Sequence, residues 1–294
     1  MNTLTPFIYG GLGNQMFQYA FAKALSEKYG CKLNLNLYGF KIDKFYKRLF
    51  ELDRFNLQYD GIEDGNALRF NISRLMQHYP NITLLKAFFR NLIVEKTNLY
   101  EKNTLAKINT QRNYHIYGYW QDERHFVQIR TQLLSIFSPK EPLSERNREL
   151  LTKIKGSSRS IAVHVRRMHF VETGTTPVEE QHSNNHTLGE RYYQKAFKYM
   201  AENTSSPVFY IFSDHPEWAK TTFKDYPYKM VILDNDRGND FEDIVLMNNC
   251  NHHIIANSSF SWWGAWLCTS TEQIVIAPKA TAMSPKSPNR WLEF

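Results

Sequence analysis

The sequence has only three cysteines, Cys31, Cys250 and Cys268, among its 294 residues. An odd number without paired spacing excludes a disulfide framework and a zinc site of the C-x-x-C type. We therefore expect the three side chains to be small buried apolar groups in a reducing compartment.

Long hydrophobic runs are also missing, because no stretch reaches the roughly 20 apolar residues that a membrane-spanning helix needs. The N-terminal segment, MNTLTP, contains neither the basic region nor the apolar core of a secretory signal. Both absences favour a soluble cytoplasmic protein.

Acidic residues are fewer than basic ones, with 29 Asp and Glu against 36 Lys and Arg, for a net charge of +7. The basic excess favours anionic partners such as nucleotide phosphates, acidic glycans or an anionic membrane surface. No dense Lys/Arg run or nucleic-acid-binding motif is present, so nucleic acid is not an expected partner. Aromatic residues make up 15% of the chain, and their ring faces suit a core or the packing of a sugar.

The first half opens with the pattern of a Rossmann-like unit. An apolar strand at 4–9 is followed by a glycine loop at 10–13, a helical pattern at 16–25 and a second strand at 32–37. The loop reads GGxG and lacks the third glycine of the dinucleotide fingerprint, so NAD binding and an oxidoreductase are not expected.

Two interpretations of this loop stay open. Its glycines serve a tight turn and nothing more, or the amides of Asn14 and Gln15 at the start of the helix bind sugar hydroxyls.

A strand is expected at 115–120, followed by a helix that Asp122 caps and that runs to Phe137. The proline-containing segment 138–142 and the polar stretch up to Ser158 then interrupt the pattern. We therefore predict two domains, residues 1–150 and 151–294.

The second half alternates strands and helices, which predicts a parallel α/β sheet with helices on both faces. Strands are expected at 161–165, 208–212, 230–233, 253–256 and 274–276, and helices near 188–203, 215–224, 240–251 and 260–270. Ligands bind such sheets at the carboxyl ends of the strands, so the residues that follow each strand are the candidate site.

Basic side chains follow the first of these strands. His164, Arg166 and Arg167 lie at its carboxyl end, and the planar guanidinium of arginine suits phosphate because it donates two parallel hydrogen bonds. Surface arginines after an edge strand are the simpler alternative.

Polar groups follow two further strands. Asp214 either caps the next helix or accepts hydrogen bonds from guanine. The serine-rich segment 257–261 precedes a helix, where free N–H groups and the helix dipole favour a phosphate, while its tryptophans are expected in the core. Asp234 and Asp236 are interpreted as turn residues because the spacing does not complete a calcium loop.

The order of these motifs resembles the bacterial α-1,2-fucosyltransferases of glycosyltransferase family 11, which use GDP-fucose. The motifs are GGLGNQMFQYAFA from Gly10, HVRR from His164, FSD from Phe212 and IIANSSFSWWGAWL from Ile254. The resemblance extends over nearly the whole chain. It implies a GT-B fold of two Rossmann-like α/β domains facing each other across a cleft, with the acceptor on 1–150 and GDP-fucose on 151–294.

The resemblance also implies residue roles. Arg166 would bind the β-phosphate, Asn14 would face the reacting sugar, and no metal or other cofactor would be required. Donor binding would involve His164 and Asp214 at the guanine, Arg167, and Asn257, Ser258, Ser259, Phe260 and Ser261 at the pyrophosphate. The acceptor-side loop would contain Gly11, Gly13 and Gln15.

One departure from the family concerns the catalytic base. The family continues His-x-Arg-Arg with Gly-Asp-Tyr, whereas this chain has Met168, His169 and Phe170. His169 can accept a proton near neutral pH, and Glu172 is a second candidate base; the sequence leaves both open.

The function implied is inverting transfer of L-fucose from GDP-β-L-fucose to the 2-hydroxyl of a terminal galactose in a cell-surface glycan precursor, such as a lipid-linked O-antigen unit. The alternative is a catalytically decayed nucleotide- or glycan-binding protein with the same fold.

Overall fold

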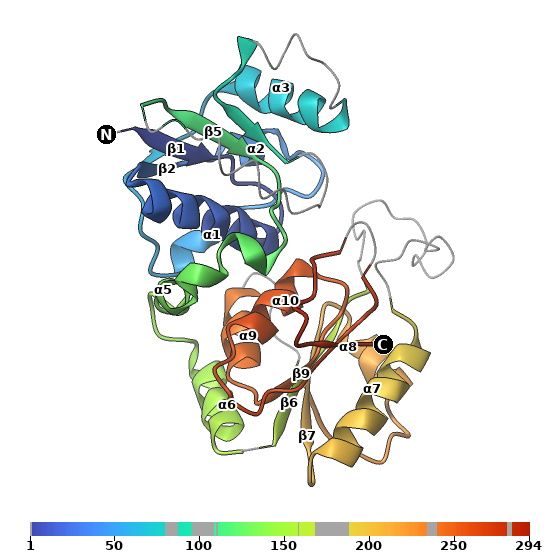
Figure 1. Cartoon of the computed structure of the whole chain (residues 1–294). Coiled ribbons are helices and arrows are strands. Elements are labelled where there is room, and N and C mark those ends of the chain that lie inside the picture. The colour runs from blue at the N-terminus through green and yellow to red at the C-terminus, as the bar shows by residue number, and fades with distance from the viewer. Residues whose placement is uncertain are drawn as a thin grey trace. The chain divides into compact units, whose positions relative to one another are not determined.

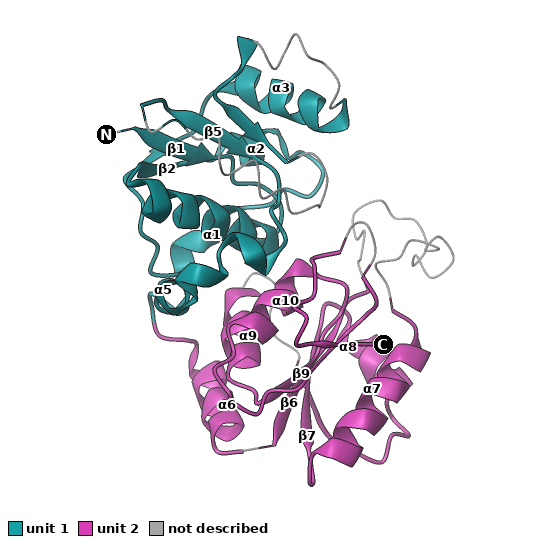
Figure 2. Cartoon of the chain, in the orientation of Figure 1, with its two compact units in different colours: residues 1–141 teal, residues 142–294 magenta. Residues whose placement is uncertain are grey.

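The computed structural model describes residues 2–79, 88–95, 109, 111–157, 159–167, 188–233, 240–280 and 284–294. The chain forms two compact units, an N-terminal unit of residues 1–141 and a C-terminal unit of residues 142–294 (Figure 2). Each unit is built on its own parallel sheet, which confirms the predicted α/β class with two Rossmann-like units.

The division lies between residues 141 and 142, whereas the sequence places it after residue 150. The helix α6 (Glu145–Lys155) belongs to the C-terminal unit. Its first turn is attached there by Glu242, whose carboxylate accepts hydrogen bonds from the Ser144 N–H at 2.9 Å and from the Asn147 amide.

The N-terminal unit has a five-stranded sheet in the order β3-β2-β1-β5-β4. Its helix α1 covers one face and α3 the other (Figure 1). The strands are β1 (Thr3–Pro6), β2 (Lys32–Asn36), β3 (Gly61–Glu63), β4 (Leu92–Val94) and β5 (Tyr114–Tyr117). The helices are α1 (Leu12–Tyr29), α2 (Tyr38–Ile42), α3 (Ala67–His78) and α5 (Arg130–Ile136), with 3-10 turns at Leu52–Arg54, Glu123–His125 and Val127–Ile129.

Helix α1 begins at Leu12, four residues before the apolar pattern predicts. The Gly11 carbonyl accepts the N–H groups of Asn14 and Gln15 at 2.9 and 3.1 Å, so the helix starts at the glycine loop itself. It ends at Gly30, whose φ of +62° is the left-handed conformation that favours glycine at a helix end.

The prediction of a helix over 122–137 is wrong for the first half of that range. Asp122 caps as predicted, because its carboxylate accepts the Arg124 N–H at 3.0 Å. However, the chain then makes two 3-10 turns, and the α-helix itself starts only at Arg130.

The C-terminal unit has a six-stranded sheet in the order β11-β10-β9-β6-β7-β8. The strands are β6 (Ser160–Val165), β7 (Val208–Ser213), β8 (Lys229–Ile232), β9 (His252–Ile254), β10 (Val275–Ala277) and β11 (Leu292–Glu293). The further helices are α7 (Glu190–Asn203), α8 (Pro216–Thr222), α9 (Asp240–Asn248) and α10 (Ser259–Trp266).

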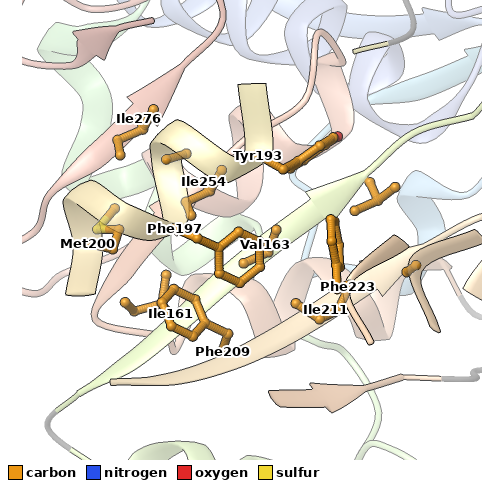
Figure 3. Packing of buried hydrophobic residues seen from close by; sticks show 13 residues of the cluster. Ile161, Val163, Tyr193, Phe197, Met200, Phe209, Ile211, Phe223, Ile254 and Ile276 are labelled. Atoms are coloured by element: carbon orange, nitrogen blue, oxygen red, sulfur yellow. The ribbon is translucent and has the colours of Figure 1, made fainter. Parts of the chain in front are cut away.

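Strand β6 is buried at every position and sends alternate side chains to the two faces. Ile161, Val163 and Val165 pack with Phe197 of α7 and Phe209 of β7 in the core cluster of Figure 3. Ala162 lies on the opposite face, in a second cluster with residues of α6 and α9. His164 therefore shares the face of α9.

The three cysteines are free and buried, as expected. Among the residues that the structure describes, no helix has the length and apolarity to span a bilayer.

Candidate functional site

The carboxyl ends of three neighbouring strands bring the candidate residues of the C-terminal unit together. Strand β6 lies between β7 and β9, with Val165 paired to Ser213 and Val163 paired to Ile254. Residues that follow these strands therefore leave the sheet at the same edge. The predicted convergence at this edge of the sheet is confirmed for the segments after β6, β7 and β9.

Asp214 holds both arginines that leave β6. Its carboxylate lies 3.3 Å from Nη1 of Arg166 and accepts the backbone N–H of Arg167 at 2.8 Å. The side chains of Arg166 and Asp214 are 30% and 23% exposed, so a ligand can reach the pair. Asp214 does not cap α8, because Pro216 is the first helical residue and His215 is the N-cap, with Nδ1 accepting the Trp218 N–H at 3.0 Å.

His164 is a buried neutral histidine. Its ring centroid lies 5.6 Å from that of Phe260, and its Nδ1 has no hydrogen-bond partner among the described residues. Burial lowers the pKa of His164 from 6.5 to about 3, and the charge of Arg166 adds to this effect while Asp214 opposes it. At neutral pH the imidazole can therefore offer a hydrogen bond but no positive charge.

Arg167 turns away from Arg166 toward α7 and α8. Its guanidinium lies 4.3 Å from the ring centroid of Trp218, and Nη1 approaches the Leu188 carbonyl at 3.5 Å. Sequence reasoning missed Trp218, since only the fold shows that α8 passes beneath this arginine. It also missed Tyr193, whose hydroxyl donates to the His164 carbonyl at 3.1 Å and fixes the end of β6.

The start of α10 carries the serine-rich segment. Ser258 is its N-cap, and its hydroxyl oxygen accepts the Phe260 N–H at 3.3 Å. Ser261 is completely buried, and its hydroxyl lies 3.4 Å from the carbonyls of Ala256 and Ser258. The Ser261 hydroxyl is therefore used inside the turn. The Phe260 N–H is taken by the Ser258 hydroxyl, and the other N–H groups of the first turn that α10 cannot satisfy itself are the groups that suit a phosphate.

The tryptophans of α10 point into the core, as predicted. Trp262, Trp263 and Trp266 are each at most 1% exposed. Helices α9 and α10 approach closely at Gly264, where an added Cβ would lie 2.9 Å from Cβ of Met247. This packing fixes the direction in which the start of α10 points.

The glycine loop of the N-terminal unit connects β1 to α1. Gly11 is the N-cap, Gly13 is buried, and half-buried Asn14 accepts a hydrogen bond from Nε2 of Gln121 at 2.8 Å. Gly10 has a φ of +81°, and an added Cβ would lie 3.1 Å from Nδ2 of Asn14. The role of Asn14 toward a sugar stays a prediction.

Gln15 differs from the expectation that its amide faces a ligand. It is completely buried. Its Nε2 donates to the carbonyls of Gly10 and Leu49 at 2.9 Å, and its Oε1 accepts the Glu51 N–H at 3.0 Å. Gln15 therefore attaches the segment around Leu49 to the glycine loop.

The two candidate bases, His169 and Glu172, lie outside the described residues, as do Asp234 and Asp236. Their roles stay predictions.

Comparison with known proteins identifies the family. The sequence profile of glycosyl transferase family 11 matches residues 3–289, almost the entire chain. The chain belongs to glycosyltransferase family 11.

Curated relatives agree with this membership. An alpha-1,2-colitosyltransferase from Escherichia coli is 33% identical over 287 residues, which cover 95% of this chain and 92% of the relative. The O-antigen biosynthesis glycosyltransferase WbnK from Escherichia coli is 30% identical over 92% of both chains. A mouse galactoside 2-alpha-L-fucosyltransferase, Sec1, is 26% identical over 61% of this chain and 54% of its own length. This family 11 member is therefore a glycosyltransferase.

Proposed function

We propose that this protein is an inverting α-1,2-fucosyltransferase that moves L-fucose from GDP-β-L-fucose to the 2-hydroxyl of a terminal galactose in a cell-surface glycan precursor. The observation that carries the donor assignment is the juxtaposition of Arg166 and the start of α10. Both follow strands that are neighbours in one parallel sheet, where a diphosphate suits the guanidinium and the N–H groups together.

The geometry supports a simple mechanism. As the bond between fucose C1 and the GDP oxygen lengthens, the sugar becomes oxocarbenium-like and negative charge grows on the β-phosphate. Arg166 and the N–H groups at the start of α10 stabilise that charge, and each contact contributes on the order of 2–4 kcal/mol. Asp214 keeps the guanidinium of Arg166 at the strand edge through their 3.3 Å ion pair.

The remaining donor contacts follow from charge and position. Neutral His164 and the carboxylate of Asp214 would hold the guanine, whose N1–H and N2–H groups are donors that a carboxylate accepts. Asn14 would contact the reacting sugar. The attacking hydroxyl loses its proton to a base, for which His169 and Glu172 are the candidates.

Colitosyl transfer is the second candidate function, because the relative with 33% identity is named an alpha-1,2-colitosyltransferase. Colitose is fucose without its 3-hydroxyl. A site that uses a buried polar group to bind the 3-hydroxyl would reject colitose, whereas an apolar contact there would accept it. Comparing the rates of transfer from GDP-fucose and GDP-colitose therefore shows whether the pocket around the 3-position of the sugar is polar or apolar.

The acceptor would be a galactose-terminated O-antigen precursor, in keeping with the relative WbnK. If that precursor is carried on a lipid, this basic chain of net charge +7 would work at the anionic inner face of the membrane.

A donor and acceptor screen tests the proposal. Purified protein is incubated with GDP-fucose or GDP-colitose and galactose-terminated glycans, and the linkage of the product is determined by NMR. We expect an α-1,2 product with GDP-fucose and none with Arg166→Ala. GDP binding without transfer from either donor would instead support the decayed binding protein, and transfer from GDP-colitose alone would replace fucose by colitose.

A further inference from the structure

The face of the N-terminal sheet beneath α3 divides into an apolar half and a polar half. Toward the carboxyl ends of the strands, Phe7, Phe70 and Tyr117 form a buried aromatic cluster under α3. Toward the amino ends the same face carries Thr5 and its cross-strand partner His115, which are buried polar residues.

A cavity of about 650 Å³ is lined by His115 of this polar half and by basic side chains from neighbouring segments. The basic residues are Arg69 on α3, Arg90 just before β4, and Arg112 just before β5. Glu63 also lines it. Three separate segments of the chain therefore place basic groups around one space.

The charges in this cavity do not cancel. Three arginines contribute +3 and Glu63 contributes −1, which leaves +2 when His115 is neutral. In the described part of the chain, no acidic side chain forms an ion pair with Arg69, Arg90 or Arg112. A ligand with two negative charges would neutralise the cavity.

Two buried nitrogens next to the cavity lack partners among the described residues: Nδ1 of His115 and Nε of Arg69. His115 is 7% exposed, and its Nε2 lies 3.0 Å from Nδ2 of Asn66 and 3.6 Å from Oε2 of Glu63. Because both unpartnered nitrogens are shielded from solvent, the accessible parts of the three arginine side chains are the groups that can meet a ligand.

We propose that this cavity binds a phosphate ester dianion. Phosphate matches the site in charge, offers several acceptor oxygens, and fits the planar donor pattern of arginine. An uncharged sugar would leave the excess positive charge unneutralised. The source of the phosphate is a soluble phosphorylated sugar or the headgroup of a membrane lipid. This inference is independent of fucosyl transfer.

Binding of inorganic phosphate and galactose 1-phosphate to the full chain, measured by calorimetry, tests the soluble source. The Arg166→Ala background removes phosphate binding at the proposed donor site. Flotation with phosphatidic acid vesicles, compared with phosphatidylcholine vesicles, tests the lipid source.

Arg90→Gln/Arg112→Gln changes two exposed side chains, and Arg69→Gln changes the partly buried one. Arg148→Gln, at an exposed position on α6, is the control for the one charge that Arg69→Gln removes, and Arg148→Gln/Lys153→Gln is the control for the two charges that the double variant removes.

We expect binding of at least one probe to weaken by at least about tenfold in Arg90→Gln/Arg112→Gln and in Arg69→Gln, with both controls unchanged. Loss of sugar phosphate binding identifies the soluble source, and loss of vesicle binding alone identifies the headgroup. The proposal is overturned if no probe binds the parent protein, if Arg90→Gln/Arg112→Gln binds as tightly, or if a control loses as much as the variant it matches. Because Arg90→Gln/Arg112→Gln changes only exposed residues, it keeps the test decisive if Arg69→Gln does not fold.

Discussion

Nη1 of Arg166 lies 3.3 Å from the carboxylate of Asp214, across the gap between two neighbouring parallel strands. The same carboxylate accepts the N–H of Arg167 at 2.8 Å. One acid thereby sets both the direction of the chain as it leaves β6 and the place of the arginine that we assign to the β-phosphate.

Asp214→Asn separates the charge of this group from its shape. Asn keeps an oxygen for the Arg167 N–H but no longer holds the Arg166 guanidinium by charge. We expect kcat/KM for the donor to fall on the order of 10- to 100-fold, because small displacements of a catalytic group have effects of this size. The measurement is steady-state release of GDP.

Glu217→Gln is the matched control for this variant. It breaks the exposed ion pair between Glu217 and Lys220 on α8, and such pairs contribute little to stability. Its activity should equal that of the parent. Equal activity of Asp214→Asn and the parent would show that the ion pair does not position Arg166.

Gly264→Ala tests the contact that sets the direction of α10. The new Cβ would lie 2.9 Å from Cβ and 3.0 Å from Sδ of Met247, so the two helices must shift. Denaturant unfolding should show a loss of about 1–3 kcal/mol. Gly65→Ala, where an added Cβ meets nothing within 4 Å, should leave stability nearly unchanged. If both variants lose the same stability, the close approach of α9 and α10 at Gly264 does not account for the loss.

Acid should destabilise the protein through its buried histidines. The pKa of His164 lies at about 3 in the folded chain against 6.5 for an ordinary histidine. The unfolded chain therefore binds a proton that the folded chain does not, so this contribution is complete above pH 6.5 and is lost as the pH falls toward 3. Burial lowers the pKa of His125 and His253 to about 4, with the same sign. Glu95 opposes them, because burial raises its pKa to about 7.

His164→Asn removes the proton that the unfolded chain binds at His164 and the folded chain does not. Between pH 4 and 6, the rise of unfolding free energy with pH should become shallower by about 1.4 kcal/mol per pH unit. Denaturant unfolding at a series of pH values gives both slopes. Identical slopes for variant and parent would mean that His164 titrates normally in the folded chain.

Transfer should continue in EDTA, because Arg166 and the start of α10 supply the positive charge that a metal would otherwise bring. Initial rates with and without chelator check this expectation. Strict dependence on added Mn²⁺ would contradict it and would direct attention to Asp234 and Asp236.

Much of the fold was predictable because its long strands are apolar and β-branched. Strand β6 and the helix after the glycine loop appear in the sequence as clear periodic patterns. The three-residue strands β3 and β4 were not predicted, since so short a segment has no period. Predictions also failed where backbone groups decide the outcome: the Gly11 carbonyl starts α1 early, and the backbone of Leu49 and Glu51 binds the buried amide of Gln15.

The candidate site was predictable as a set of strand ends but not as a set of contacts. Parallel topology alone brings the residues after β6, β7 and β9 to one edge. The pairing of Arg166 with Asp214 and the stacking of Arg167 on Trp218 depend on side-chain directions. The sequence does not specify these directions, because the partners lie far apart along the chain.

A crystal structure of the protein with GDP tests the central claim most directly. We predict that the β-phosphate lies within hydrogen-bond distance of the Arg166 guanidinium and of N–H groups in the first turn of α10. A diphosphate bound elsewhere, or one that touches only one of these two groups, would contradict the account.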